Sequence, residues 1–298
     1  MNVITTNHLT KYYGKSRGIA DISLSVPSGD FFGFIGPNGA GKSTTIRILL
    51  GLISATSGSA EIFGRDIRKQ KTDLLAEIGY LPAETMFYSG MRVKELLRLS
   101  AELHKKDCSD EAAKLCRRLE LDPSRKIDDL SLGNRKKAGI VCALQHRPKL
   151  YILDEPTSGL DPLMQREFYS LLKERNENGA TVFLSSHILS EVQRYCRNAA
   201  VIRDGRILVC DSVADLGHTG AKRVTLRGVT AAPPLERIRD VKISPDTVSF
   251  LYSGVPAVLF DTLSTLPITD VTIAEPDLEE IFMHYYAKEE PGNDHFQA

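Results

Sequence analysis

The chain has 298 residues, of which 42% are hydrophobic, and its 38 basic and 38 acidic side chains give a formal net charge of zero. This length suggests about two domains, each able to bury a core. The balanced charge and the absence of a long basic run argue against a nucleic-acid partner. No window approaches about 18 consecutive apolar residues, and the first residues lack the features of a signal peptide. With five unpaired-looking cysteines, the composition fits a soluble intracellular protein with reduced thiols.

The first informative segment is a glycine-rich loop between a predicted strand at 31–35 and a predicted helix at 43–50. It fills every position of the phosphate-loop pattern GxxxxGK[ST]. Glycines leave the peptide N–H groups open to phosphate oxygens, and the positive end of the following helix dipole points at the same anion. We therefore expect a nucleoside triphosphate to bind here, with Lys42 on the outer phosphates and Ser43 on Mg²⁺. The expected binding residues are Gly36, Pro37, Asn38, Gly39, Ala40, Gly41, Lys42, Ser43 and Thr44.

Residues from about 83 to 128 change character, because apolar residues recur there at helical spacing. The segments 92–100 and 111–119 each have an apolar face opposite a charged face, which predicts two amphipathic helices. A short polar segment, Leu-Ser-Leu-Gly-Asn at 130–134, then precedes a predicted helix at 136–145. By itself this segment reads as an ordinary helix cap.

Two carboxylates follow the next apolar strand, at 150–153. Adjacent acids at the end of a buried strand are costly to keep ionised unless a cation or a proton offsets them. We expect Asp154 to hold Mg²⁺ together with Ser43, and Glu155 to orient and deprotonate an attacking water. Another apolar strand, at 181–186, ends at His187.

After residue 211 the nucleotide motifs stop. Short strands are predicted at 223–226 and 247–252, followed by a helix at 256–266. An amphipathic helix is predicted at 277–286, and a disordered polar tail from residue 288.

The order of these motifs resembles that of the ATPase subunits of ATP-binding cassette (ABC) transporters, and the ending of the chain resembles that of bacterial ABC-2 type exporter ATPases. The resemblance implies an α/β fold: a P-loop NTPase core with a helical subdomain at about 83–128, together forming a domain over 1–211. A small α+β accessory domain over 212–287 and a disordered tail over 288–298 would follow.

The resemblance also assigns roles to further residues. His187 would be the switch histidine, catalytic together with Glu155, and Tyr13, rather than Tyr12, would stack on adenine. The segment 130–134 is similar to the family's LSGGQ signature, with Leu and Asn replacing its third and fifth residues. In the family this segment reaches the ATP that the other subunit of a dimer holds. The segment Ser-Gly-Leu-Asp at 158–161 resembles one that crosses the dimer interface in such proteins. The implied ATP contacts from these two segments are Ser131, Gly133, Asn134 and Asp161.

One position departs from the family pattern. After the strand at 78–82 the family has a glutamine that contacts Mg²⁺ or the water and links the site to the membrane partner. This chain has Ala83, whose methyl group can do neither, followed by Glu84. A carboxylate at 84 could take over the metal or water contact if the loop shifts by one residue, but it does not donate hydrogen bonds as an amide does. The departure therefore leaves two alternatives for the link to the membrane partner, one through Glu84 and one without it.

The implied function is a Mg²⁺-dependent ATPase subunit that powers transport, in the direction of export, through a separately encoded polytopic permease. The chain would act as a homodimer, or as a pseudo-dimer with a related cassette, at the cytoplasmic side of the membrane. The alternative is a soluble ABC ATPase that acts on a macromolecular complex without a permease. The single cassette and its short helical insertion favour transport, although substrate and direction cannot be read from these motifs.

Overall fold

A computed structural model describes residues 1–217 and 221–276. The helix predicted at 277–286 and the tail from 288 lie outside the described residues. The chain divides into two compact units, the first from Met1 to Asp211 and the second beginning at Ser212. Each unit is described by itself.

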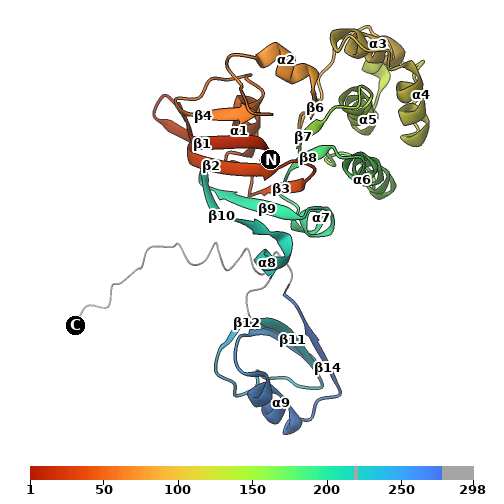
Figure 1. Ribbon diagram of the computed structural model, residues 1–298. Helices are drawn as coiled ribbons and strands as arrows, with labels where there is room; N and C mark the ends of the chain where they lie inside the picture. The colour runs from red at the N-terminus through yellow and green to blue at the C-terminus, as the bar shows by residue number, and fades with distance from the viewer. Residues whose placement is uncertain (218–220, 277–298) are drawn as a thin grey trace. The chain divides into compact units, whose positions relative to one another are not determined.

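A six-stranded sheet with the order β10-β9-β3-β8-β7-β6 forms the centre of the first unit (Figure 1). Parallel pairings join β9 to β3, β3 to β8, β8 to β7 and β7 to β6. The residues of β3, β7 and β8 are buried at every position, as expected of parallel strands covered on both faces. Because these strands run in parallel, their carboxyl ends bring the phosphate loop, Asp154, Glu155 and His187 to one edge. The bounds are β3 Phe31–Ile35, β6 Ile78–Leu81, β7 Leu150–Asp154, β8 Thr181–Ser186, β9 Asn198–Arg203 and β10 Arg206–Ser212.

A second, antiparallel sheet in the first unit has the order β2-β1-β4-β5. Its strands are β1 Asn2–Tyr13, β2 Ser16–Pro27, β4 Ser57–Ile62 and β5 Arg65–Asp66. Helix α1, Lys42–Leu49, buries Ile46, Ile48 and Leu49 in a core shared with side chains of both sheets. Strands β1 and β2 are 12 residues each and form a bulged pair.

The predicted helices at 92–100 and 111–119 are confirmed as α3, Val93–Leu103, and α4, Ser109–Arg118. They lie together with α5 at one end of the first unit, and we call α3 and α4 the helical subdomain (Figure 1). The other helices are α2 Lys71–Ala76, the 3₁₀ turn η1 Ile127–Asp129, α5 Leu132–Leu144, α6 Pro162–Glu177 and α7 Leu189–Tyr195.

Ion pairs join α4 to the rest of the unit. The Arg118 guanidinium contacts the carboxylates of Glu167 and Glu174 on α6, the second at 2.7 Å. Glu111 pairs with Arg147 and with Arg175, also on α6. Burial raises the pKa of the Glu111 carboxyl, but the two guanidinium groups outweigh it and lower the pKa overall. The helical subdomain is thus attached to α6 by buried and half-buried charges.

The second unit contains a four-stranded antiparallel sheet, β12-β13-β11-β14. Val224, Phe250 and Tyr252 of the sheet share a core with Leu259 and Leu263 of α9. A helix on one antiparallel sheet is an α+β arrangement. The strands predicted at 223–226 and 247–252 are confirmed, while β12 and β14 were not predicted. The elements are α8 Val213–Gly217, β11 Lys222–Arg227, β12 Ile238–Ser244, β13 Thr247–Tyr252, α9 Pro256–Ser264 and β14 Asp270–Ala274.

Candidate active site

A cavity of about 390 Å³ opens against the loop between β3 and α1. The sequence predicted that this loop cradles phosphates, and the structure places most of it in the cavity wall. Gly36 and Ala40 of the predicted set do not line the cavity: Gly36 packs against Ile202, and Ala40 is buried. The lining residues are Tyr13, Arg17, Gly18, Pro37, Asn38, Gly39, Gly41, Lys42, Ser43, Thr44, Ala83 and Glu155.

Two glycines of the loop have no room for a side chain. Gly41 has φ of 108°, and a Cβ there would lie 2.6 Å from Ile19 Cγ2 and 2.9 Å from the Gly18 carbonyl oxygen. A Cβ on Gly36 would lie 2.2 Å from the Ile202 carbonyl oxygen. Gly41 is therefore required for its backbone conformation and for close packing, and Gly36 for close packing. Glycines at such positions also leave the N–H groups of a phosphate-binding loop accessible.

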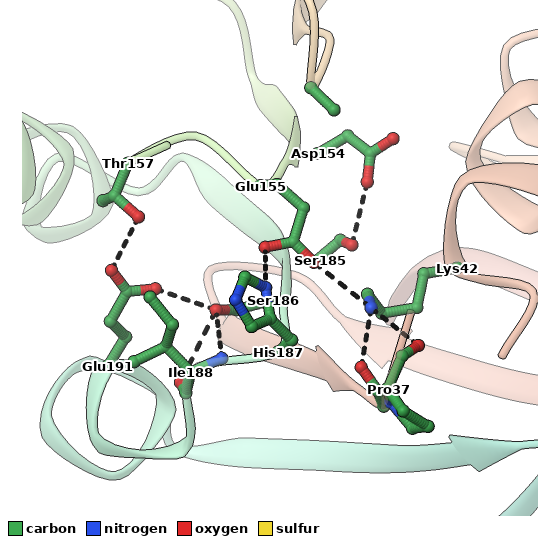
Figure 2. A network of polar contacts seen from close by, with 12 residues as sticks. Pro37, Lys42, Asp154, Glu155, Thr157, Ser185, Ser186, His187, Ile188 and Glu191 are labelled. Atoms are coloured by element: carbon green, nitrogen blue, oxygen red, sulfur yellow. Dashed lines mark hydrogen bonds and ion pairs between the residues drawn. The ribbon is translucent and has the colours of Figure 1, made fainter. Parts of the chain in front are cut away.

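The Lys42 ammonium lies at one side of the polar network in Figure 2, between the phosphate loop and Glu155. It is 6% exposed and donates hydrogen bonds to the carbonyl oxygens of Gly36 at 2.6 Å and Pro37 at 3.1 Å. Its Nζ also lies 3.2 Å from Glu155 Oε1, which accepts no hydrogen bond in this arrangement. The Lys42–Glu155 contact is therefore an ion pair without hydrogen-bond geometry, and it joins the phosphate loop to the end of β7.

The Glu155 carboxylate lies between Lys42 and His187 (Figure 2). Its Oε2 is 2.6 Å from His187 Nδ1, and its side chain is 16% exposed. The Glu155 backbone has φ of 46°, a conformation that costs a residue with a Cβ about 1–3 kcal/mol. Its N–H donates to the Ser185 carbonyl oxygen at 3.1 Å. The structure thus brings the two predicted catalytic residues together and holds Glu155 in a strained backbone conformation.

Asp154 is 3% exposed, and its Oδ1 accepts a hydrogen bond from Ser185 Oγ at 2.9 Å. No basic side chain in 1–217 or 221–276 forms an ion pair with it. Burial, and then the charge of Asp154, raise the pKa of the nearby Tyr80 hydroxyl to about 12. Ser43 lines the cavity, whereas Asp154 does not. A carboxylate and a hydroxyl group both offer hard oxygen atoms, which suit Mg²⁺.

A second buried carboxylate, Glu191 of α7, was not predicted. It is 8% exposed and accepts hydrogen bonds from Thr157 Oγ1 at 2.7 Å and from Ser186 Oγ at 2.8 Å (Figure 2). Thr157 follows Glu155 by two positions, and Ser186 directly precedes His187. Glu191 therefore joins the segments that carry both predicted catalytic residues. In sequence it reads as an acid in the first turn of a helix, so no local signal identifies it.

The predicted signature residues lie at the start of α5 and do not line the cavity. Ser131 is the N-cap, and its Oγ accepts a hydrogen bond from the Asn134 N–H at 3.3 Å. A Cβ on Gly133 would lie 2.9 Å from the Gly159 carbonyl oxygen, so α5 begins in close contact with the segment after β7.

Asp161, predicted to lie in a segment that crosses a dimer interface, also lies outside the cavity. It caps α6, because its Oδ1 accepts hydrogen bonds from the N–H groups of Leu163 and Met164 at 3.0 Å each.

Of the remaining predicted positions, some line the cavity and others do not. Tyr13 lines the cavity at 47% exposure, with the Lys11 ammonium 5.2 Å from its ring centroid, while Tyr12 does not line it. Ala83 lines the cavity, whereas Glu84 is exposed and does not. The structure thus favours Tyr13 over Tyr12 as the residue next to the phosphate loop. It does not place Glu84 where the side chain would take over the contact of the family's glutamine.

Comparison with known proteins identifies the family. The family described as ABC transporter matches residues 19–158. The bacitracin transport ATP-binding protein BcrA of Bacillus licheniformis is 42% identical over 213 residues, which cover 69% of this chain and 68% of the relative. The linearmycin resistance ATP-binding protein LnrL of Bacillus subtilis (strain 168) is 29% identical and covers 95% of this chain and 97% of its own length.

A solved structure, described as the ATP binding subunit of an ABC transporter, superimposes with a TM-score of 0.68 at 30% identity. It covers 72% of this chain and 91% of its own. Both the matched motifs and the superimposed fold are those of a P-loop ATPase cassette. The chain belongs to the ATP-binding proteins of ABC transporters and is an ATPase of that family.

Proposed function

We propose that this chain is the Mg²⁺-dependent, ATP-hydrolysing subunit of an exporter, acting as a dimer on a separately encoded permease at the cytoplasmic face of the membrane. The observation that carries the chemical part is the position of the Glu155 carboxylate, in contact with Lys42 of the phosphate loop and with His187 at once (Figure 2). This arrangement places a proton acceptor at the wall of the cavity that would hold the γ-phosphate.

Each residue of the site would have a separate role in the reaction. The phosphate-loop N–H groups and Lys42 would bind the phosphates, and Tyr13 would stack on the base. Ser43 and Asp154 would hold Mg²⁺, which supplies charge neutralisation of the phosphate oxygens when bound. Glu155 would orient the attacking water and accept its proton, and His187, 2.6 Å from Oε2, would hold the carboxylate in place.

A second copy would complete each site. Ser131, Gly133 and Asn134 lie at the N-terminus of α5, outside the cavity of their own chain. Backbone N–H groups at a helix N-terminus bind anions, so these residues suit a γ-phosphate held by another copy. A two-fold arrangement would use the same two surfaces twice, the phosphate loop of one copy facing the α5 N-terminus of the other.

The transport part of the proposal is supported by the relatives. The names of BcrA and LnrL refer to bacitracin transport and linearmycin resistance, which fit the removal of a compound from the cell. Within residues 1–217 and 221–276, no helix combines the length and apolarity needed to cross a membrane. We expect a polytopic membrane protein to co-purify with the chain. If the chain purifies instead with a ribosomal or other soluble complex, the alternative of a non-transport ATPase applies.

The chemistry is tested with Glu155→Gln, which keeps the size of the side chain and removes its ability to accept a proton. We expect ATP to remain bound and hydrolysis to fall by about 10²–10⁴-fold, the usual contribution of general base catalysis. Lys42→Ala should instead weaken ATP binding itself. The matched control is Glu177→Gln on the exposed surface of α6, where the side chain is 62% exposed and turnover should be unchanged. Near-normal hydrolysis by Glu155→Gln would refute this assignment.

A further inference from the structure

Lys136 of α5 is a buried lysine that the sequence did not single out. It is 2% exposed, and its Nζ donates hydrogen bonds to the carbonyl oxygens of Pro82 at 3.0 Å, Ala83 at 2.8 Å and Glu155 at 3.2 Å. An ammonium group has three N–H donors, so each donor has one backbone acceptor. Burial lowers the pKa of Lys136 to about 8, and the charges of Asp154 and Glu155 act in the opposite direction.

The three acceptors belong to two segments of the site. Pro82 and Ala83 follow β6, and Ala83 lines the nucleotide cavity. Glu155 follows β7 and has φ of 46°, which a residue with a Cβ rarely adopts without support. Its N–H donates to the Ser185 carbonyl oxygen, and its own carbonyl oxygen accepts hydrogen bonds from Lys136 Nζ at 3.2 Å and from the Ser158 N–H at 3.4 Å. Both backbone polar groups of Glu155 are thus fixed by neighbouring elements, and this fixes the direction in which its side chain leaves the backbone.

We propose that Lys136 is a positioning residue for hydrolysis: its ammonium group holds the backbone of Glu155 and the loop at Pro82–Ala83 in one fixed arrangement. The inference depends on the proposed role of Glu155 as the base. Glu84 is exposed and does not line the cavity. Lys136, on the helix that begins at the signature, instead links this loop to Glu155. A movement of the loop would reach Glu155 through Nζ, and a movement of α5 would reach both.

A purely structural lysine would behave differently. A buried ammonium costs free energy because it leaves water, and apolar side chains of similar size often stabilise a protein as well or better. If Lys136 served only packing, an unbranched apolar replacement would leave the catalytic constant of the folded protein unchanged. If it positions Glu155, the same replacement would slow the chemical step and leave nucleotide affinity intact.

The test is Lys136→Met, with Lys137→Met, its half-exposed neighbour on α5, as the matched control. We expect kcat to fall about tenfold, the effect of losing about 1.4 kcal/mol of a hydrogen bond to a charged group. KM and the Kd for ATP should change by less than about twofold, because no phosphate contact is removed. Activities are normalised to folded protein. If Lys136→Met is insoluble, Lys136→Gln is used in its place. Because glutamine retains amide donors, kcat should then fall only about threefold.

The double variant with Glu155→Gln gives the second measurement. Because Lys136 acts through Glu155, adding Lys136→Met to Glu155→Gln should leave the residual rate unchanged, although the two losses would multiply if they were independent. A wild-type kcat in Lys136→Met, or multiplied losses in the double variant, would overturn the inference. If Glu155→Gln alone hydrolyses ATP at a near-normal rate, the proposed function fails instead, so the two failures are distinguishable.

Discussion

Replacement of Glu191 by alanine should destabilise the first unit, because two buried hydroxyl groups lose their acceptor. Each buried polar group left without a partner costs about 1–3 kcal/mol. The Thr157 hydroxyl loses its bond of 2.7 Å, whereas Ser186 Oγ loses its bond of 2.8 Å but continues to accept from the Ile188 N–H at 2.9 Å. Removal of a buried carboxylate that has no ion pair in the described ranges offsets part of this cost. We therefore expect a net loss of about 3 kcal/mol.

The loss is measured by thermal unfolding of the purified chain. For a unit of this size, a loss of about 3 kcal/mol lowers Tm by about 6–12 °C. Glu191→Gln removes the charge but keeps one acceptor, so its Tm should fall by less than half as much. Glu177→Ala on the exposed side of α6, where the side chain is 62% exposed, is the control and should leave Tm unchanged within about 1–2 °C.

A double variant identifies the contact responsible. Thr157→Val alone should lower Tm, but in the Glu191→Ala background it should have no further effect or a small stabilising one, because the hydroxyl is already without its acceptor. In addition, kcat should fall in Glu191→Ala, since Glu191 holds the residue directly before His187. Equal Tm values for Glu191→Ala and Glu177→Ala would refute the reasoning.

Two further predictions concern the dimer and the effect of pH. A mixture of Ser131→Arg chains and Lys42→Ala chains should regain part of the activity that each variant lacks alone, because one site of the mixed dimer is intact. Strong activity of Ser131→Arg alone would exclude the trans arrangement. Burial, and then the charge of the stacked His104, lower the pKa of His146 to about 4, whereas its unfolded value is about 6.5. The unfolded state then binds the extra proton, so stability should be lost as pH falls from 6.5 towards 4. His146→Gln should reduce the Tm difference between pH 7.5 and pH 5, and an unchanged difference would contradict this assignment.

The parts of the site that are contiguous in sequence could be predicted from it. The phosphate loop follows a wholly apolar strand, and Asp154 and Glu155 end another, so pattern and position agree at each motif. The parallel order of the strands then places these ends at one edge of the sheet. The roles of the individual residues in catalysis stay predictions.

Long-range contacts could not be predicted, because a lysine on a helix usually faces solvent. Lys136 is 53 residues from Ala83, and Glu191 is 34 residues from Thr157. Nothing in either local sequence distinguishes a buried polar residue from a surface one. The edge strands β12 and β14 were also missed. β14 is exposed throughout and β12 at almost every position, so neither has a buried face, and the alternation of Val271 and Ile273 with polar residues in β14 covers only five residues. In β1 the register shifts of several bulges interrupt the same period, whereas β2 alternates regularly from Ile22 to Val26.

The double ion pair of Arg118 has a consequence for how this sequence can drift over evolutionary time. Its guanidinium serves two acids, Glu167 and Glu174, which lie two turns apart on α6. Loss of either acid leaves the other in place, so neutral substitution can proceed at one of them without detaching the helical subdomain. Loss of the arginine leaves two carboxylates without their shared partner. These ion pairs are therefore redundant in their acids and depend on one arginine, while the Glu111–Arg175 pair attaches α4 to α6 independently. Among descendants of this chain, Arg118 should vary less than Glu167 or Glu174.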